Sequence, residues 1–407
     1  MLWWQTLKMA GFCSDGTPHH ALYKPNKIAL QVRTHIQMTF IPASLDDFEE
    51  LARKSMAPGS FAYYSTGSSS ESTLRRNREA FEKLLIRPKI LIDVENVNTS
   101  TTVLGQPISM PICVAPTAYH GLAHYDGELA SARGAARMNT LYTLSSNSGY
   151  GIGQVADAAR KVNENALQWF QLYMEKDRDL TEKLVRKCEQ AGYKALVVTT
   201  DRPRLGPRLR TVRNGFRLPQ YVKRANYESE NDGAEDYMSG EMYPGMTWED
   251  IKWIKSITKL PIVIKGIFRG EDAKLALDSS PATLEVLPEI VQACRGSKVE
   301  VYFDGGIRTG TDVFKALAIG ARAVFIGRPI LYGLAYQASV IVSPWLRSRT
   351  HIIIIQGESG VRQVLSMISH DFRLTMGLAG CTTVSAIDKS FLTTEAQLDF
   401  TKTLAKL

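Results

Sequence analysis

From about residue 108 onwards, short continuous apolar runs alternate with longer segments whose apolar residues recur every three to four positions. The first pattern is typical of strands buried on both faces of a sheet, and the second of amphipathic helices. The predicted strands are 111–116, 141–146, 166–173, 195–201, 261–266, 299–306 and 323–327. The predicted helices between them are 127–138, 154–162, 180–191, 248–258 and 311–319. This repeat predicts an α/β fold with a parallel sheet, most simply a (β/α)₈ TIM barrel.

Two segments depart from this pattern. Between the strands at 261–266 and 299–306 the chain shows two helical patterns in succession, 271–277 and 282–294, and no strand. After the last strand, residues 338–356 form an apolar, β-branched stretch that contains a proline and would be an aggregation hazard if exposed. We therefore predict a barrel that lacks its sixth strand and carries an atypical insertion after the eighth.

The beginning of the chain has a different character. Residues 1–37 show no lasting periodicity and predict an unstructured N-terminal extension. Ser44, followed three positions later by Asp47, has the pattern of a helix capping box, so we expect a helical extension before the barrel. The whole of 38–392 is then expected to form one barrel domain.

The C-terminal tail, 393–407, ends in Ala405-Lys406-Leu407. This tripeptide is similar to the Ser-Lys-Leu address of peroxisomal proteins. It predicts peroxisomal localisation, with the peroxisomal import receptor as a partner.

The composition is that of an ordinary globular protein, with 44% hydrophobic and 22% charged residues in a chain of 407. It excludes a disordered or collagen-like chain. The sequence contains no apolar window of 18 residues, so we predict no transmembrane helix. The net charge of +8 includes no run of five basic residues, so we expect no nucleic-acid partner. The five cysteines are far apart and form no C-x-x-C pair, which predicts reduced thiols and no metal site.

Two glycine-containing turns follow the last two predicted strands. They are Asp304-Gly305-Gly306-Ile307-Arg308 and Gly327-Arg328-Pro329. Glycines at such turns let backbone N–H groups approach an oxyanion, and phosphate sites of TIM barrels lie after strands seven and eight. We interpret the pair as a phosphate site; the alternative is two tight turns that only cap their helices.

Polar residues mark the carboxyl ends of the predicted strands, where barrels carry their active sites. They are Thr117, Ser145, Gln171, Tyr173, Thr199, Asp201, Lys265, Asp304 and Arg308. Lys265 ends an otherwise apolar strand, and a buried ammonium group requires an anionic partner.

Seven motifs occur in order along the chain: Tyr63-Tyr64-Ser65-Thr66-Gly67, Pro116-Thr117-Ala118, Phe170-Gln171-Leu172-Tyr173, Val198-Thr199-Thr200-Asp201, Ile264-Lys265-Gly266, Asp304-Gly305-Gly306-Ile307-Arg308 and Gly327-Arg328-Pro329. Together they resemble the FMN-dependent α-hydroxy acid oxidases, the family of glycolate oxidase, over about residues 38–392. The resemblance implies oxidation of an (S)-2-hydroxy acid to a 2-oxo acid. FMN would be the cofactor, with electrons passing to O₂ to give H₂O₂, and the protein would be a homotetramer.

The resemblance also implies roles for individual residues. The expected cofactor-binding residues are Pro116, Thr117, Ala118, Ser145, Gln171, Thr199, Lys265, Asp304, Gly305, Gly306, Arg308, Gly327 and Arg328. The expected substrate-binding residues are Tyr63, Tyr173 and Arg208. Lys265 would stabilise the reduced, anionic flavin ring, and Arg208 would be one of two arginines that pair with the substrate carboxylate.

The chain departs from the family between these motifs. The family carries a strand that ends in Ser-Asn-His-Gly, followed by Arg-Gln-Leu-Asp; its histidine is the catalytic base and its arginine the second carboxylate partner. Here Lys274–Asp278 continues directly into Ser279 without either motif. We therefore expect no catalytic base in this chain. His120 and His124, in the loop after the first strand, lie too far around the barrel to replace it.

This departure leaves three interpretations of the chain. It is an oxidase by family that is inactive as written, or a non-catalytic protein that binds flavin or another partner. Alternatively it is a misassembled isoform, with one segment skipped and 338–356 read through from non-coding sequence. A different FMN barrel enzyme, such as an isomerase, is disfavoured because the residues of a hydroxy acid site are kept.

Overall fold

A computed structural model of the chain describes residues 41–204, 206–227, 243–275, 283–340, 352–355 and 357–398. Its centre is a seven-stranded sheet in which every neighbouring pair is parallel. The strands are β4 (Ile112–Val114), β5 (Tyr142–Ser145), β6 (Gln168–Leu172), β7 (Leu196–Thr199), β8 (Ile262–Lys265), β9 (Tyr302–Asp304) and β10 (Ala323–Ile326). Each lies within one of the seven predicted runs, so the strand count and the α/β class are confirmed.

The sheet is open between β8 and β9. Its strand order is β8-β7-β6-β5-β4-β10-β9, which leaves these two strands at the edges. All four residues of β8 are only half-buried, whereas those of β5, β6, β7 and β10 are buried. A cavity of about 820 Å³ lies beside both edge strands, with Val263, Phe303 and Leu287 in its wall. Among the described residues, β8 and β9 thus have a neighbouring strand on one side only, and β8 is less buried than the inner strands.

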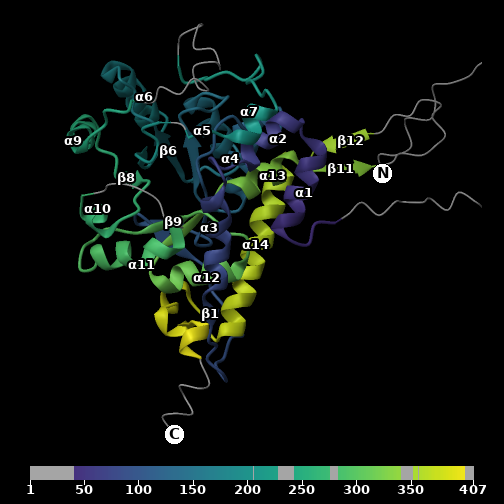
Figure 1. Cartoon of the computed structure of the whole chain (residues 1–407), viewed down its shortest axis with the longest axis vertical. Helices are drawn as coiled ribbons and strands as arrows, with labels where there is room; N and C mark the ends of the chain where they lie inside the picture. Colours follow the sequence, from purple (N-terminus) through teal and green to yellow (C-terminus); the bar gives the residue numbers. More distant parts are fainter. Residues whose placement is uncertain are drawn as a thin grey trace, which may run out of the picture.

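Helices cover the sheet between successive strands (Figure 1). They are α4 (Gly127–Arg137), α5 (Ile152–Arg160), α6 (Arg178–Gln190), α9 (Trp248–Ile257), α10 (Gly270–Leu275), α11 (Thr283–Ala293), α12 (Gly310–Ile319) and α13 (Arg328–Ala335). Helices α10 and α11 follow each other as predicted, and the segment between them lies outside the described residues. The short helix α7 (Leu209–Arg213) and α13 were not predicted from the sequence.

Three helices precede the barrel, α1 (Leu45–Ser55), α2 (Pro58–Ser65) and α3 (Ser72–Glu82). The predicted capping box is confirmed: the Ser44 hydroxyl accepts from the Asp47 amide at 3.2 Å, and the Asp47 carboxylate accepts from the Ser44 amide at 2.9 Å. The ring of Phe48 on α1 lies edge-on to Tyr336, which directly follows α13. This packing fixes α1 against the end of α13, while residues 1–37 lie outside the described part of the chain.

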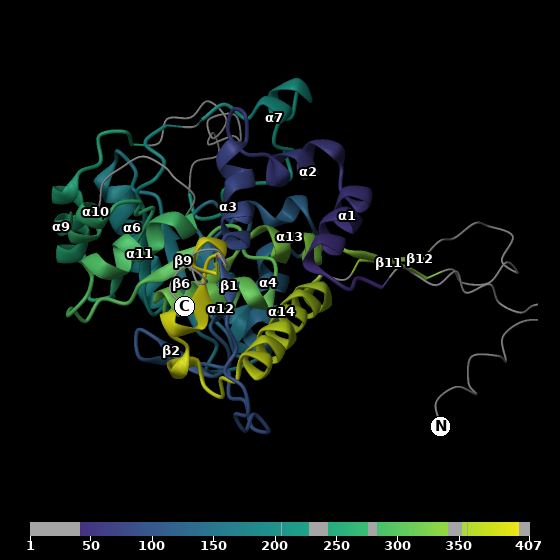
Figure 2. The ribbon, with the colours of Figure 1, turned by 60° about the horizontal axis from the view of Figure 1, so that its bottom comes forward.

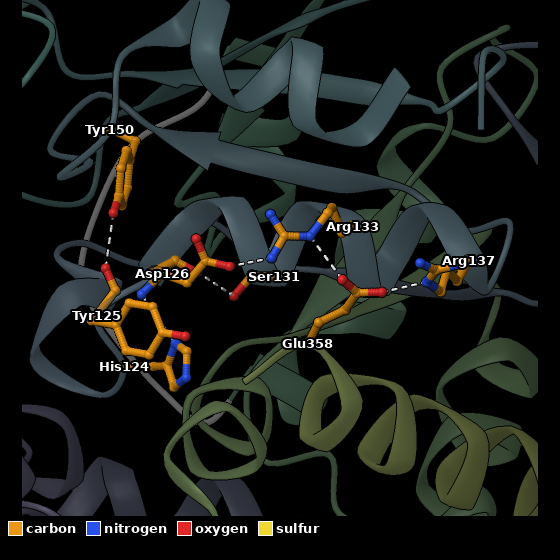
Figure 3. A network of polar contacts seen from close by, with 9 residues as sticks. His124, Tyr125, Asp126, Ser131, Arg133, Arg137, Tyr150 and Glu358 are labelled. Carbon is orange, nitrogen blue, oxygen red and sulfur yellow. Dashed lines mark hydrogen bonds and ion pairs between the residues drawn. The ribbon is translucent and has the colours of Figure 1, made fainter. Parts of the chain in front are cut away.

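The long C-terminal helix α14 (Glu358–Ala379) runs along the side of the molecule opposite α9 and α10 (Figures 1 and 2). Its first residue, Glu358, pairs with Arg133 at 2.7 Å and with Arg137, and Arg133 also pairs with Asp126 (Figure 3). A Cβ on Gly134 would lie 2.7 Å from a methyl group of Val361, so α4 and α14 are in close contact. These contacts hold the C-terminal helix against the barrel.

The insertion forms a hairpin of its own. Strands β11 (Gln337–Val340) and β12 (Ile352–Ile355) pair antiparallel, with Gln337 opposite Ile355, and project from the body of the molecule in both views (Figures 1 and 2). The prediction that this stretch is not a barrel strand is confirmed. The remaining strand pairs are β1 (Leu85–Ile86) with β13 (Leu392–Thr393), and β2 (Thr101–Val103) with β3 (Gln106–Ile108). Among the described helices none is long and apolar enough to span a membrane.

Candidate functional site

A cavity of about 480 Å³ opens at the carboxyl ends of the barrel strands. All sixteen residues assigned above to the cofactor or the substrate line it, although they come from segments as distant as α2 and α13. The structure thus brings every one of these residues to one place. The individual roles assigned to them stay predictions.

The turn between β9 and α12 forms one end of the cavity. Gly306 has φ +82°, and a Cβ there would lie 1.9 Å from the carbonyl oxygen of Asn77, so only glycine fits. The Asp312 carboxylate accepts from the amides of Arg308 and Thr309, at 2.9 Å each. The capping arrangement considered above is therefore present, and an anion at this end would have to be bound mainly by side chains.

Two buried arginines supply those side chains. Arg308 is only 12% exposed; its Nε has no hydrogen-bond partner among the described residues, and the ion pair to Asp46 is long, at 3.5 Å. Burial, with repulsion from Arg78, lowers the pKa of Arg308. Burial likewise lowers the pKa of Arg328, with repulsion from Arg308 and Arg208. An anion such as a phosphate would satisfy the free donor and relieve this repulsion, so this end of the cavity fits a phosphate group.

Lys265 stands at the carboxyl end of the edge strand β8. Its ammonium group lies 3.0 Å from the Asp304 carboxylate and 3.6 Å from that of Asp201. Burial opposes the charge, but the two carboxylates outweigh it and raise the pKa of Lys265. The prediction that this lysine needs an anionic partner is confirmed. The pair with Asp304 also connects β8 with β9 across the open part of the sheet.

A line of polar groups crosses the floor of the cavity. The Ser145 hydroxyl donates to the Gln171 side-chain oxygen at 3.1 Å, and the Gln171 amide donates to the Thr199 hydroxyl at 3.0 Å. All three residues are buried on adjacent strands. Such a fixed row of donors and acceptors suits the polar edge of a flat heteroaromatic ring, and with the phosphate end it fits FMN.

Two tyrosines and two arginines line the part of the cavity that we expect to bind the substrate, called the substrate end below. Arg208 donates from Nη1 to the Tyr63 carbonyl at 2.9 Å, and Arg202 donates from Nη1 to the Tyr173 hydroxyl at 3.0 Å. Arg202 was not assigned a role from the sequence, although it directly follows Asp201 in the loop after a strand. Tyr64 and Thr66 also line the cavity and were not assigned.

Among the described residues, no histidine lines this cavity. His120 is buried and contacts Thr117 through Nε2 and Ser131 through Nδ1, the latter at 2.8 Å. Burial lowers the pKa of His120 to about 3. His124 stacks on Tyr125 with ring centroids 4.3 Å apart. Both are structural residues of the loop, as expected.

Comparisons with known proteins agree with this geometry. The model of the FMN-dependent dehydrogenase family matches residues 52–279 and 276–394, in two parts that meet in the segment between α10 and α11. Human 2-hydroxyacid oxidase 1 is 43% identical over 377 residues, which cover 86% of this chain and 95% of the relative. Glycolate oxidase 1 of rice, Oryza sativa subsp. indica, is 41% identical with the same coverage.

A similar solved structure is that of mandelate oxidase, with a TM-score of 0.75 and 37% identity over 87% of this chain and 98% of that one. The match over most of the chain, the barrel architecture and the shared cavity residues all lead to one family, whose cofactor is FMN. The chain belongs to the FMN-dependent dehydrogenase family, among relatives that oxidise 2-hydroxy acids.

Proposed function

We propose that this chain is an FMN-binding member of the 2-hydroxy-acid oxidase group that has lost most of its capacity for turnover. Its parent reaction is the oxidation of an (S)-2-hydroxy acid to the 2-oxo acid, with O₂ reduced to H₂O₂. The observation that carries the proposal is the cavity itself. It keeps all sixteen expected residues, yet none of the described histidines lines it.

The residues present can do the following. Arg308 and Arg328 would bind the phosphate, and the Ser145–Gln171–Thr199 row would hold the ring edge. Lys265 would place a positive charge beside the ring. Tyr63, Tyr173 and Arg208 would bind and orient the hydroxy acid. FMN, when bound, supplies the acceptor for two electrons.

Among the described residues that line the cavity, we find no group suited to remove the hydroxyl proton of the substrate. Asp201, the carboxylate in this part of the cavity, is already paired with Lys265 at 3.6 Å. Loss of a general base alone costs about 10²–10⁴ in rate. In the resembling family this base ends a strand and the second carboxylate-binding arginine follows it, and neither sequence motif occurs between α10 and α11 here. We therefore propose that the catalytic histidine and that arginine are absent from this chain.

The test is the visible absorption spectrum of the purified protein together with oxygen uptake on glycolate, lactate and longer 2-hydroxy acids. We expect yellow protein with bound FMN and oxygen uptake at least about 100-fold below that of an ordinary oxidase of this family, measured in parallel. Brisk oxygen uptake would contradict the proposed loss of the base. Colourless protein that takes up no added FMN would contradict the FMN-binding part.

A second candidate is a misassembled isoform, favoured by the open sheet and the separate β11–β12 hairpin. Sequencing the transcript across the codons for 278–279 and 337–357 tests this interpretation, because an abundant message with only these junctions would contradict it.

Peroxisomal import through Ala405-Lys406-Leu407 is part of the proposal. It is tested by deleting the tripeptide and imaging the protein fused to a fluorescent protein. The tripeptide lies outside the described residues. Tetramer formation, implied by the family, is tested by sedimentation.

A further inference from the structure

Arg202 occupies a distinctive position at the substrate end of the cavity. It follows Asp201 at the carboxyl end of β7 and lines the cavity beside Tyr173. Its guanidinium carbon lies 5.3 Å from the centroid of the Tyr173 ring, and Nη1 donates to the hydroxyl of that ring at 3.0 Å. The side chain is therefore held in a defined orientation by a residue that itself lines the cavity.

Arg208 is held in a similar way on the same cavity. Its guanidinium carbon lies 5.1 Å from the centroid of the Tyr63 ring, and Nη1 donates to the Tyr63 carbonyl at 2.9 Å. The substrate end thus presents two guanidinium groups, each beside a tyrosine ring. Planar guanidinium groups with several N–H donors are well suited to a carboxylate, which can accept from both at once.

The charges around the substrate end also favour the binding of an anion there. Lys265, another cation that lines the cavity, is paired with both Asp201 and Asp304, so its charge is largely compensated. Within the described part of the chain, Arg208 contacts a carbonyl and an aromatic ring and forms no ion pair with a carboxylate. An incoming monoanion is therefore attracted to Arg208 more than to Lys265, and Arg202 lines the same cavity.

We propose that Arg202 is a second substrate-binding arginine, which together with Arg208 binds the carboxylate of a 2-hydroxy acid. The inference rests on the proposed function and extends it, because it supplies from the β7 loop a guanidinium that the missing segment would otherwise have provided. The hydroxyl of Tyr173, oriented by Arg202, is left close to the same substrate.

The experiment measures binding rather than turnover. FMN-loaded protein is titrated with (S)-lactate under anaerobic conditions, and the dissociation constant is read from the perturbation of the flavin spectrum. Three variants are compared with the unchanged chain: Arg202→Gln, Arg202→Lys and Arg204→Gln. Arg204 is the matched control, because it lies in the same loop and carries the same charge but is exposed and does not line the cavity.

We expect Arg202→Gln to raise the dissociation constant for lactate about 10- to 150-fold, the usual loss for a hydrogen bond to a charged group. Arg202→Lys should recover part of the binding because it keeps the charge, and Arg204→Gln should change it less than about twofold. FMN affinity and melting temperature should be the same in all four proteins. A purely structural role for Arg202 would lower both and would not be rescued by lysine.

The failures are distinguishable. If the unchanged chain binds lactate and Arg202→Gln binds it equally well, the role of Arg202 is refuted while the proposed function stands. If the unchanged chain binds FMN but no hydroxy acid, both are refuted.

Discussion

Substitution of Arg308 should raise the stability of the cofactor-free protein and lower its affinity for FMN. This side chain is 12% exposed, its Nε lacks a hydrogen-bond partner among the described residues, and its ion pair to Asp46 is 3.5 Å long. It is also repelled by the neighbouring Arg78. An incompletely satisfied buried group costs about 1–3 kcal/mol. Arg308→Met, which keeps the length but removes charge and donors, should therefore stabilise the cofactor-free protein by about that amount.

The same substitution should weaken FMN binding. Removing one partner of a buried charge pair costs about 2–5 kcal/mol, which corresponds to a rise of about 30- to 5,000-fold in the dissociation constant. Stability is measured by urea denaturation of the cofactor-free protein, and affinity by quenching of FMN fluorescence. Riboflavin, which has no phosphate, should bind the variant and the unchanged chain about equally.

Arg322→Met is the matched control for Arg308→Met. Arg322 lies before the first residue of β10, at the opposite end of the strand from the cavity, where it donates to the Thr102 carbonyl at 2.7 Å. Its removal should leave FMN affinity unchanged. If Arg308→Met bound FMN as tightly as the unchanged chain, or lost FMN and riboflavin equally, the phosphate assignment would be wrong.

Three more substitutions test other parts of the structure. In the folded state the pKa of His120 is lowered to about 3, whereas in the unfolded chain a histidine binds a proton below about pH 6.5. The free energy of unfolding should therefore fall as pH drops from 6.5 towards 3, by up to about 1.4 kcal/mol per pH unit. In His120→Gln, urea midpoints measured at pH 7 and pH 5 should differ less than in the unchanged chain. Glu358→Gln should cost about 1–2 kcal/mol in urea denaturation, because it removes the carboxylate shared by Arg133 and Arg137 (Figure 3). Gly306→Ala should cost about 2–5 kcal/mol and abolish FMN uptake in a fluorescence titration, because its Cβ would collide with the Asn77 carbonyl.

Local patterns predicted most of the barrel. Continuous apolar runs identified all seven strands, because a strand buried on both faces cannot alternate with polar residues. The capping box at Ser44 and the succession of α10 and α11 were also visible, since both depend on residues close in sequence. Because barrels carry their active sites at the carboxyl ends of their strands, the polar residues at those ends were expected to surround one cavity, and the structure agrees.

Features that depend on contacts between distant segments were not predictable in this way. The ion pair of Lys265 with Asp304 joins the two edge strands, and it depends on how the ends of these strands converge on one cavity. Arg202 follows a strand end, yet nothing in its sequence neighbourhood shows that its guanidinium contacts Tyr173. The contact of Arg133 with Glu358 spans 225 residues and depends on how α14 packs against α4.

The opening in the sheet affects the two parts of the site differently. Of the two arginines proposed to bind the phosphate, Arg308 follows the edge strand β9, whereas Arg328 follows β10, which has parallel neighbours on both sides. Lys265 instead ends the edge strand β8, which pairs with β7 on one side only, and Lys265, Asp201 and Asp304 line both the cofactor cavity and the apolar cavity beside the edge strands. An opening at this point exposes the charges beside the ring to water, which weakens their effect compared with a closed site. Cofactor binding therefore rests partly on the continuous sheet and partly on the two edge strands, whereas catalysis would need both a base and a closed wall. A histidine alone would restore only the first of these.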